Sequence, residues 1–158
     1  MGEWLKDYPI DDTAAGFMGT MKRMGDDLRK DIEVTVNNVV DKTFNKILAD
    51  SPVDKGNYIA SHRMAKGAER TDFFDGDLGG PQKSAARREA GIAHSKQAAS
   101  GFRWNIGDDE IWFSNNVGHA LDVELGGPRW VHTDPYVVYE HAEKAMENIF
   151  IPEEMAKL

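Results

Sequence analysis

The chain has 158 residues and a mass of 17.6 kDa, which predicts a single domain over residues 1–158. It holds no cysteine, which excludes disulfides, thiolate catalysis and cysteine zinc sites. Nineteen Lys and Arg residues against 27 Asp and Glu give a net charge of −8, which disfavours a protein that binds nucleic-acid phosphates.

The composition predicts a soluble, intracellular chain without a membrane partner. Glu3, Asp7 and Pro9 interrupt the start of the sequence, so we expect no signal peptide there. No run of about 18 apolar residues occurs, so we also expect no membrane-spanning helix.

A long helix is predicted over residues 12–50. Apolar residues recur there at intervals of three or four, the period of an α-helix, and Asp12 or Thr13 is placed to cap its start. The stripe consists of Phe17, Met21, Met24, Leu28, Ile32, Val36, Val39, Thr43 and Ile47. Such a helix would be about 57 Å long, whereas a compact domain of this size is about 40 Å across. The helix therefore either breaks near Gly25 or projects from the body and offers its stripe to a partner.

Three methionines lie on one side of this helix, at Met18, Met21 and Met24. Methionine clusters suit adaptable interfaces, although core packing is their more common role. We therefore take these three residues as interface candidates.

The middle of the chain is predicted to hold a strand and an insertion. Pro52 disfavours helix at the preceding residue and so ends the long helix. A strand is expected over residues 57–64, with one face made by Tyr58, Ala60, His62 and Met64. Residues 65–100 are interpreted as an insertion, in which a loop rich in Gly and Asp precedes a helix over residues 84–99 that is too polar to be central.

A hairpin is predicted over residues 102–114, turning at residues 107–109. Its second strand would place Trp112 on the face opposite Ile111 and Phe113, so an aromatic side chain would point outward. Residues 117–125 are expected to form a short helix or strand that ends in the Gly126-Gly127-Pro128 turn.

A helix is predicted over residues 134–150, because Thr133 is a capping residue and Pro135 suits a first helical turn. Its buried face would consist of Val138, Ala142, Ala145 and Ile149, and Pro152 would end it. The expected fold is α+β: a long N-terminal helix and a C-terminal helix packed on a small antiparallel β-sheet, with an inserted loop and helix.

No catalytic, cofactor or metal site is predicted. No two of the five histidines have the i, i+2 or i, i+4 spacing that places two imidazoles on one metal ion. Asp72, Asp75 and Asp77 lack the spacing and closing Glu of a calcium loop, so we interpret them as a solvated loop. The glycines at residues 76–80 lack the Lys-Ser/Thr of a phosphate loop, and no Gly-x-Ser-x-Gly elbow occurs.

A pair of carboxylates is the main enzymatic alternative. A lytic glycosidase needs an acid that faces a second carboxylate about 5 to 9 Å away. Asp122 and Glu124 are candidates, together with Asp108 and Asp109 in the predicted turn. Turn chemistry accounts for the last two and no pattern marks a sugar cleft, so we expect no enzyme.

Two stretches of the sequence resemble a known family. Ser51-Pro52-Val53-Asp54-Lys55-Gly56 is similar to the Pro-apolar-Asp-Thr-Gly turn of phage head-to-tail joining proteins, and it likewise lies between a long helix and an expected strand. Asn115 to Ala120, followed by Glu124-Leu125-Gly126, is similar to their Asn-aromatic-Ala and Glu-x-Gly segment. Lys55 stands where that family has Thr, and His119 where it has Tyr. The chain thus resembles the neck, or tail-completion, family of long-tailed phages over about residues 26–150, apart from the insertion.

The resemblance implies a structural virion protein with no catalytic activity and no cofactor. Such proteins form rings, usually hexamers, between the portal-connector (adaptor) proteins and the tail tube or tail terminator. DNA passes through without specific binding, which agrees with the acidic charge of this chain. The implied location is the neck or tail of the virion, after assembly in the host cytoplasm. The alternatives are a tail terminator that caps the tube, a host-directed binding module and the glycosidase.

The resembling motifs supply further candidates for structural or interface roles. These are Pro52, Asp54, Gly56, Ala120, Glu124 and Gly126. We expect Pro52 to end the helix, Asp54 to bind backbone amides of the turn, and Gly56 to supply a positive φ. Glu124 is expected to tie the Gly126 turn to a basic residue, Arg63 or Arg129. The acidic loop over residues 71–80 is expected to be mobile and to order on docking.

Overall fold

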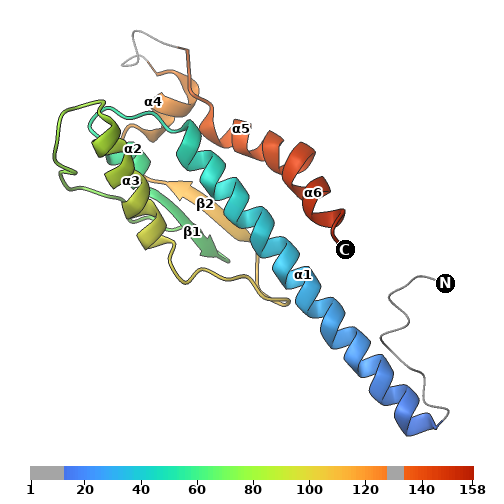
Figure 1. Ribbon diagram of the computed structural model, residues 1–158. Coiled ribbons are helices and arrows are strands. Elements are labelled where there is room, and N and C mark those ends of the chain that lie inside the picture. Colours follow the sequence, from blue (N-terminus) through green and yellow to red (C-terminus); the bar gives the residue numbers. More distant parts are fainter. Residues whose placement is uncertain (1–12, 128–133) are drawn as a thin grey trace.

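The computed structural model describes residues 13–127 and 134–158 and has an α+β architecture, as expected. A long helix, α1 (Ala14–Asp50), passes between a small sheet on one side and the C-terminal helices on the other (Figure 1). The sheet consists of β1 (His62–Lys66) and β2 (Ile111–Asn115). Four short helices complete the body: α2 (Asn57–Ala60), α3 (Ala85–Ala98), α4 (Ala120–Leu125) and α5 (Val138–Ala145). The chain then continues through the π-helix η2 (Met146–Phe150) into α6 (Ile151–Met155).

Helix α1 is continuous over 37 residues, which corresponds to a length of about 55 Å. Thr13 caps its start, since the Oγ1 atom accepts a hydrogen bond of 3.0 Å from the backbone N–H of Gly16. No break occurs at Gly25, so the interpretation of a broken helix is wrong. The N-terminal half instead extends beyond the body (Figure 1).

The two strands pair with each other in antiparallel orientation, with Met64 opposite Phe113. The predicted hairpin over residues 102–114 is therefore wrong, because only its second half is a strand and its partner is β1. The cause is Asn37 on α1, whose side chain accepts from the N–H of Trp104 at 2.9 Å and donates to its carbonyl at 2.8 Å. The backbone of this segment is thus hydrogen-bonded to a helix side chain rather than to a neighbouring strand.

The strand predicted over residues 57–64 begins only at His62. Gly56 has φ of 92°, in the left-handed region, and precedes the short helix α2. The Oγ atom of Ser61 closes that turn by donating to the carbonyl of Asn57 at 2.6 Å. A helical turn therefore replaces the first half of the expected strand.

Helix α3 confirms the helix predicted over residues 84–99, but it packs closely on α2 rather than at the margin. Gly91 is the contact point, because a Cβ atom there would overlap the side chain of Ile59. Ser95 is fully buried and donates to the carbonyl of Ile59 at 2.8 Å. Small residues, rather than an apolar stripe, allow this polar helix to approach the core.

The C-terminal helix begins at Val138, four residues later than predicted, and Thr133 lies outside the described residues. Tyr136 donates its backbone N–H to the carbonyl of Val123 at 2.9 Å, which holds the preceding segment against α4. Val138, Ala142 and Ala145 are buried as expected, whereas Ile149 is 49% exposed.

Pro152 does not end the C-terminal helix. The π-turn before it places the N–H of Ile151 on the carbonyl of Met146, five residues back. This wider turn accommodates a ring that would clash in a regular α-helix, and α6 continues through the proline.

The core has two parts, one on each side of the C-terminal half of α1. The sheet side contains Val40, Phe44, Leu48, Ile59 and Met64. The other side contains Ile47, Tyr58, Val117, Val123, Val138 and Ala142. Phe44 stacks on Phe113 of β2 with ring centroids 6.3 Å apart, while Trp112 points outward as predicted.

Candidate functional site

A buried histidine connects several elements of the body. His62 is 1% exposed, and its Nε2 atom lies 2.7 Å from the Oγ atom of Ser51 at the end of α1. Its Nδ1 atom lies 2.9 Å from the hydroxyl of Tyr139 on α5. The ring also stands edge-on to Tyr58, with centroids 4.9 Å apart. The imidazole therefore joins α1, α2, β1 and α5.

The hydrogen bonds of this group define its protonation. The Ser51 hydroxyl donates to the carbonyl of Ile47 at 2.7 Å, so its oxygen accepts from the Nε2–H of His62. The Nδ1 atom then accepts from the Tyr139 hydroxyl. Burial, followed by the charge of Arg63, lowers the pKa of His62 to about 3. His62 is thus a neutral structural residue, not a base that activates Ser51.

Glu124 binds two groups on other elements. Its Oε1 atom accepts a short hydrogen bond from the Tyr58 hydroxyl, and its Oε2 atom accepts from the backbone N–H of Tyr139 at 3.3 Å. Burial, together with the adjacent carboxylate, raises the pKa of both tyrosines. The expectation of a basic partner at Arg63 is wrong, and Arg129 lies outside the described residues.

Arg63 instead holds the acidic loop. Its Nε atom lies 2.8 Å from Asp72, whose carboxylate also binds Arg70. These two arginines lower the pKa of Asp72 to about 2. Farther along the loop, Phe74 packs edge-on against His94 of α3 with centroids 4.4 Å apart. The loop over residues 71–80 is therefore fixed to the body, contrary to the expectation that it orders only on docking.

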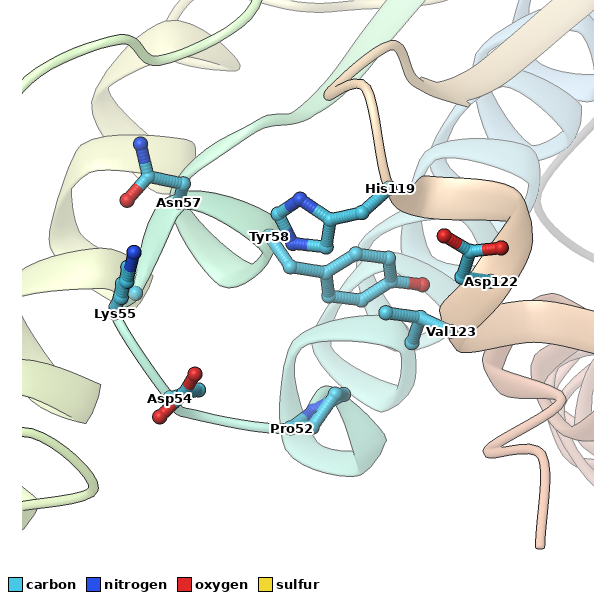
Figure 2. A pocket seen from close by; sticks show the side chains of 9 residues that line it. Pro52, Asp54, Lys55, Asn57, Tyr58, His119, Asp122 and Val123 are labelled. Atoms are coloured by element: carbon cyan, nitrogen blue, oxygen red, sulfur yellow. The ribbon is translucent and has the colours of Figure 1, made fainter. Parts of the chain in front are cut away.

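A pocket of about 260 Å³ lies where the first resembling stretch and α2 meet the start of α4, with His119 as the residue from the second stretch (Figure 2). It is lined by Pro52, Asp54, Lys55, Gly56, Asn57, Tyr58, His119, Asp122 and Val123. Figure 2 shows the Tyr58 ring between the turn after α1 and the side chains of α4. Its charged residues carry both signs, so the pocket favours no single ligand charge.

The motif residues take structural positions around this pocket. Pro52 directly follows the end of α1, and Gly56 has the expected positive φ. Gly126, with φ of 70°, ends α4 in the left-handed conformation. Ala120 is half-buried against the core.

Asp54 behaves differently from the prediction. Its side chain is exposed and forms no hydrogen bond with the turn amides of the described residues. Its backbone carbonyl accepts instead from the N–H of Lys83, at 3.2 Å. The turn is therefore joined to the insertion through the backbone of Asp54 and not through its carboxylate.

Two of the four carboxylates considered for a glycosidase, Glu124 and Asp108, are engaged within the fold. Glu124 is bound by Tyr58 and Tyr139, as described above. Asp108 accepts from Lys66 and from the backbone N–H of Asn105, each at 2.7 Å, and these bonds lower its pKa. Asp108 thus has the turn role expected for it.

A second candidate surface lies on the projecting half of α1. Phe17, Met18, Met21 and Leu28 are 46%, 67%, 49% and 58% exposed. The candidate Met24 is half-buried among them. A hollow of about 510 Å³ runs along this stretch. It is lined by Met21, Met24, Gly25, Asp27, Leu28, Asp31 and Leu158.

Two pairings essential to the site have no local signal in the sequence. Ser51 and His62 are 11 residues apart, and His62 and Tyr139 are 77 apart. Asn115, which belongs to the second resembling stretch, donates to the carbonyl of Tyr58 at 2.9 Å. Of these residues, Ser51 and Asn115 belong to the resembling stretches, whereas His62, Tyr58 and Tyr139 do not.

The described residues were also compared with the requirements of a metal site and of a membrane-spanning helix. Over residues 13–127 and 134–158, no group of three His, Asp or Glu side chains is placed to hold a metal ion. No helix of that region is long and apolar enough to cross a bilayer.

The chain matches no protein-family model, no curated protein and no solved structure.

Proposed function

We propose that this chain is a structural virion protein that forms a ring at the interface of phage head and tail. In this role it joins the portal-connector proteins to the tail and leaves a channel for DNA. It has no catalytic role. The proposal combines the resembling motifs with a helix that extends beyond the body.

The observation that carries the proposal is the exposed apolar stripe on the projecting half of α1. Full burial of a Leu, Met or Phe side chain stabilises a protein or complex by about 1.5 to 3 kcal/mol. Phe17, Met21 and Leu28 are about half exposed, so a partner that covers them would gain part of this free energy. Gly19 and Gly25 weaken the same stretch by up to about 1 kcal/mol each. A helix built this way is stabilised when a partner covers it.

The rest of the molecule suits a rigid subunit. The end of α1 is fixed by Ser51 and His62, and α4 is fixed to α2 by Glu124 and Tyr58. The stripe is therefore presented at a defined angle to the body. A net charge of −8 per copy also gives a ring that does not retain DNA phosphates.

Native mass by light scattering tests the proposal, with the protein alone and mixed with phage heads assembled without it. We expect a mass several-fold above 17.6 kDa, or transfer of the protein to the head fraction. Ring-shaped particles in negative-stain micrographs would identify the closed assembly.

Three outcomes would contradict the proposal. Binding to tail tubes instead of heads would indicate a tail terminator. A monomer that binds neither would remove the assembly role altogether. Clearing of cell walls by the pure protein, lost in a Glu124→Gln, Asp122→Asn variant that still folds, would indicate a glycosidase.

A further inference from the structure

The projecting half of α1 carries charges of opposite sign along the two edges of its apolar stripe. At about 100° per residue the stripe covers about 120° of the helix surface. It consists of Phe17, Met18, Met21, Met24, Leu28 and Ile32. Asp27 and Asp31 lie along one edge, and Lys22 and Arg29 lie along the other. The helix thus has an acidic edge and a basic edge.

This arrangement discriminates between the two ways in which two copies of the helix can pair. In an antiparallel pair, each edge faces the same edge of the other helix, so Asp31 would approach acidic residues. In a parallel pair, the acidic edge of one helix faces the basic edge of the next, which places Asp31 beside Arg29 of the neighbouring copy. Only the parallel pair is complementary in charge.

We propose that the projecting halves of α1 from neighbouring copies lie side by side in parallel and in register, with the stripe between them. This inference rests on the proposed ring, because the subunits of a ring point the same way along its axis. The occupant of the stripe is therefore a second copy of this chain.

The covering of α1 within its own chain supports this assignment. On the body half, Lys42 and Asn38 bind Glu154 of α6, at 3.0 and 2.9 Å, and so attach the C-terminal helices to α1. Helix α6 ends at Met155, and Leu158 beyond it lines the hollow beside Met24 and Leu28. Phe17, Met18 and Met21, which lie farther toward the start of α1, are exposed.

Gly25 provides a further reason for close approach of a second helix. It lies within the stripe, and a Cβ atom there would meet no other atom within 4 Å. Nothing in the described fold requires a glycine at this helical position. Its absent side chain lets a neighbouring backbone come close, as small residues do at helix interfaces.

Cysteine cross-linking tests the orientation, because the chain has no native cysteine. Met21→Cys and Leu28→Cys are made as separate single variants and oxidised in the assembled state, in solution or on heads. A parallel pair in register gives covalent dimers of both variants. An antiparallel pair brings at most one of these positions next to its own equivalent. Covalent dimers of only one variant would therefore overturn the inference, as would dimers that form only when the two variants are mixed.

Charge exchange provides an independent test. Asp31→Lys would place a lysine beside Arg29 of the neighbouring copy, and Arg29→Glu would place a glutamate beside its Asp31, so each variant alone should associate about fivefold more weakly. A one-to-one mixture of the two variants should restore association, and added salt should weaken the wild-type assembly. Stronger wild-type association in salt would overturn the parallel arrangement.

The mass measurement distinguishes failure of the proposed ring from failure of the parallel pairing. Assembled protein without covalent dimers of both cysteine variants leaves the ring in place and removes the parallel pairing. A monomer both in solution and with heads removes the ring and the pairing together. Assembly with both dimers supports both.

Discussion

The hydroxyl of Tyr58 donates a hydrogen bond to the carboxylate of Glu124, 66 residues farther along the chain. This bond connects α2, which directly follows the first resembling stretch, to Glu124 of the second stretch on α4. Asn115 adds a second link through the carbonyl of Tyr58. Tyr58 therefore links the segment after the first stretch to both parts of the second stretch, at Asn115 and at Glu124.

Replacing Glu124 with Gln should destabilise the protein by about 1 to 3 kcal/mol. The amide oxygen can accept from only one of the two donors; where it accepts from the backbone N–H of Tyr139, its NH₂ donates to the Tyr58 hydroxyl, whose own proton then loses its carboxylate acceptor. Urea unfolding of Glu124→Gln, Tyr58→Phe and the double variant measures their coupling. Asp122→Asn, on the same helix, is the matched control and should unfold almost like the wild type. Additive losses in the double variant would show that the two residues do not interact.

Stability should fall as the pH decreases below about 6.5, because His62 is buried in its neutral form. Its pKa is about 3 in the folded protein against 6.5 for a free histidine, so the unfolded chain takes up the proton first. The free energy of unfolding should decrease by up to about 1.4 kcal/mol per pH unit in this range. The stability from His62 is complete above pH 6.5 and is lost progressively toward pH 3.

Urea unfolding at pH 7 and pH 5 checks this prediction. The carboxyl groups with lowered pKa have ordinary values of 3.8 (Asp72 and Asp108) or 4.5 (Glu140 and Glu154), so they contribute mainly below this interval. His62→Gln should be less stable than the wild type at pH 7 but should lose less between the two pH values. An equal loss in both proteins would assign the dependence to other groups.

The sequence predicted the helices better than the sheet, and the reason is the range of the interactions involved. The apolar period of α1 and the alanine-rich composition of α3 are local signals. The pairing of β1 with β2 is not local, and the expected hairpin partner of β2 is instead bound by Asn37, 67 residues before Trp104. Polar side chains of α1, Asn37 at Trp104 and Glu33 at Ile106, thus bind the backbone groups that a hairpin partner would have used.

The candidate site shows the same division. The glycines at 56 and 126 could be predicted, because their left-handed conformations follow from turn chemistry. The partner of Glu124 could not, since a carboxylate accepts hydrogen bonds from tyrosine hydroxyls and backbone N–H groups as well as from arginines, and the sequence does not show which donor lies nearby. The role of His62 had no local sequence signal, because its hydrogen-bonding partners Ser51, Tyr139 and Asn115 lie in three other parts of the chain.

Gly91→Ala should destabilise the fold by about 1 to 3 kcal/mol, because the new methyl group would overlap Ile59 where α3 meets α2. Gly19→Ala is the matched control. It lies on the projecting half of α1, away from the stripe, with open space around it. That substitution should increase helix content and stability by up to about 1 kcal/mol. Thermal unfolding followed by circular dichroism measures both, and equal effects of the same sign would contradict the packing at Gly91.

A double change of Met21 and Leu28 to Glu should abolish assembly while it leaves the folded subunit intact. Both side chains are about half exposed on the projecting half of α1, so their loss removes little packing from the body. Two carboxylates in the seam between helices would meet those of the neighbouring copy without compensation. Asp26→Lys, on the opposite face of the same helix, changes a charge without touching the stripe and serves as the control. Light scattering should give a monomer for the double variant and the wild-type mass for Asp26→Lys, with the same urea midpoint at low concentration for all three proteins. Assembly that survives the double change would place the contact between copies elsewhere on the subunit.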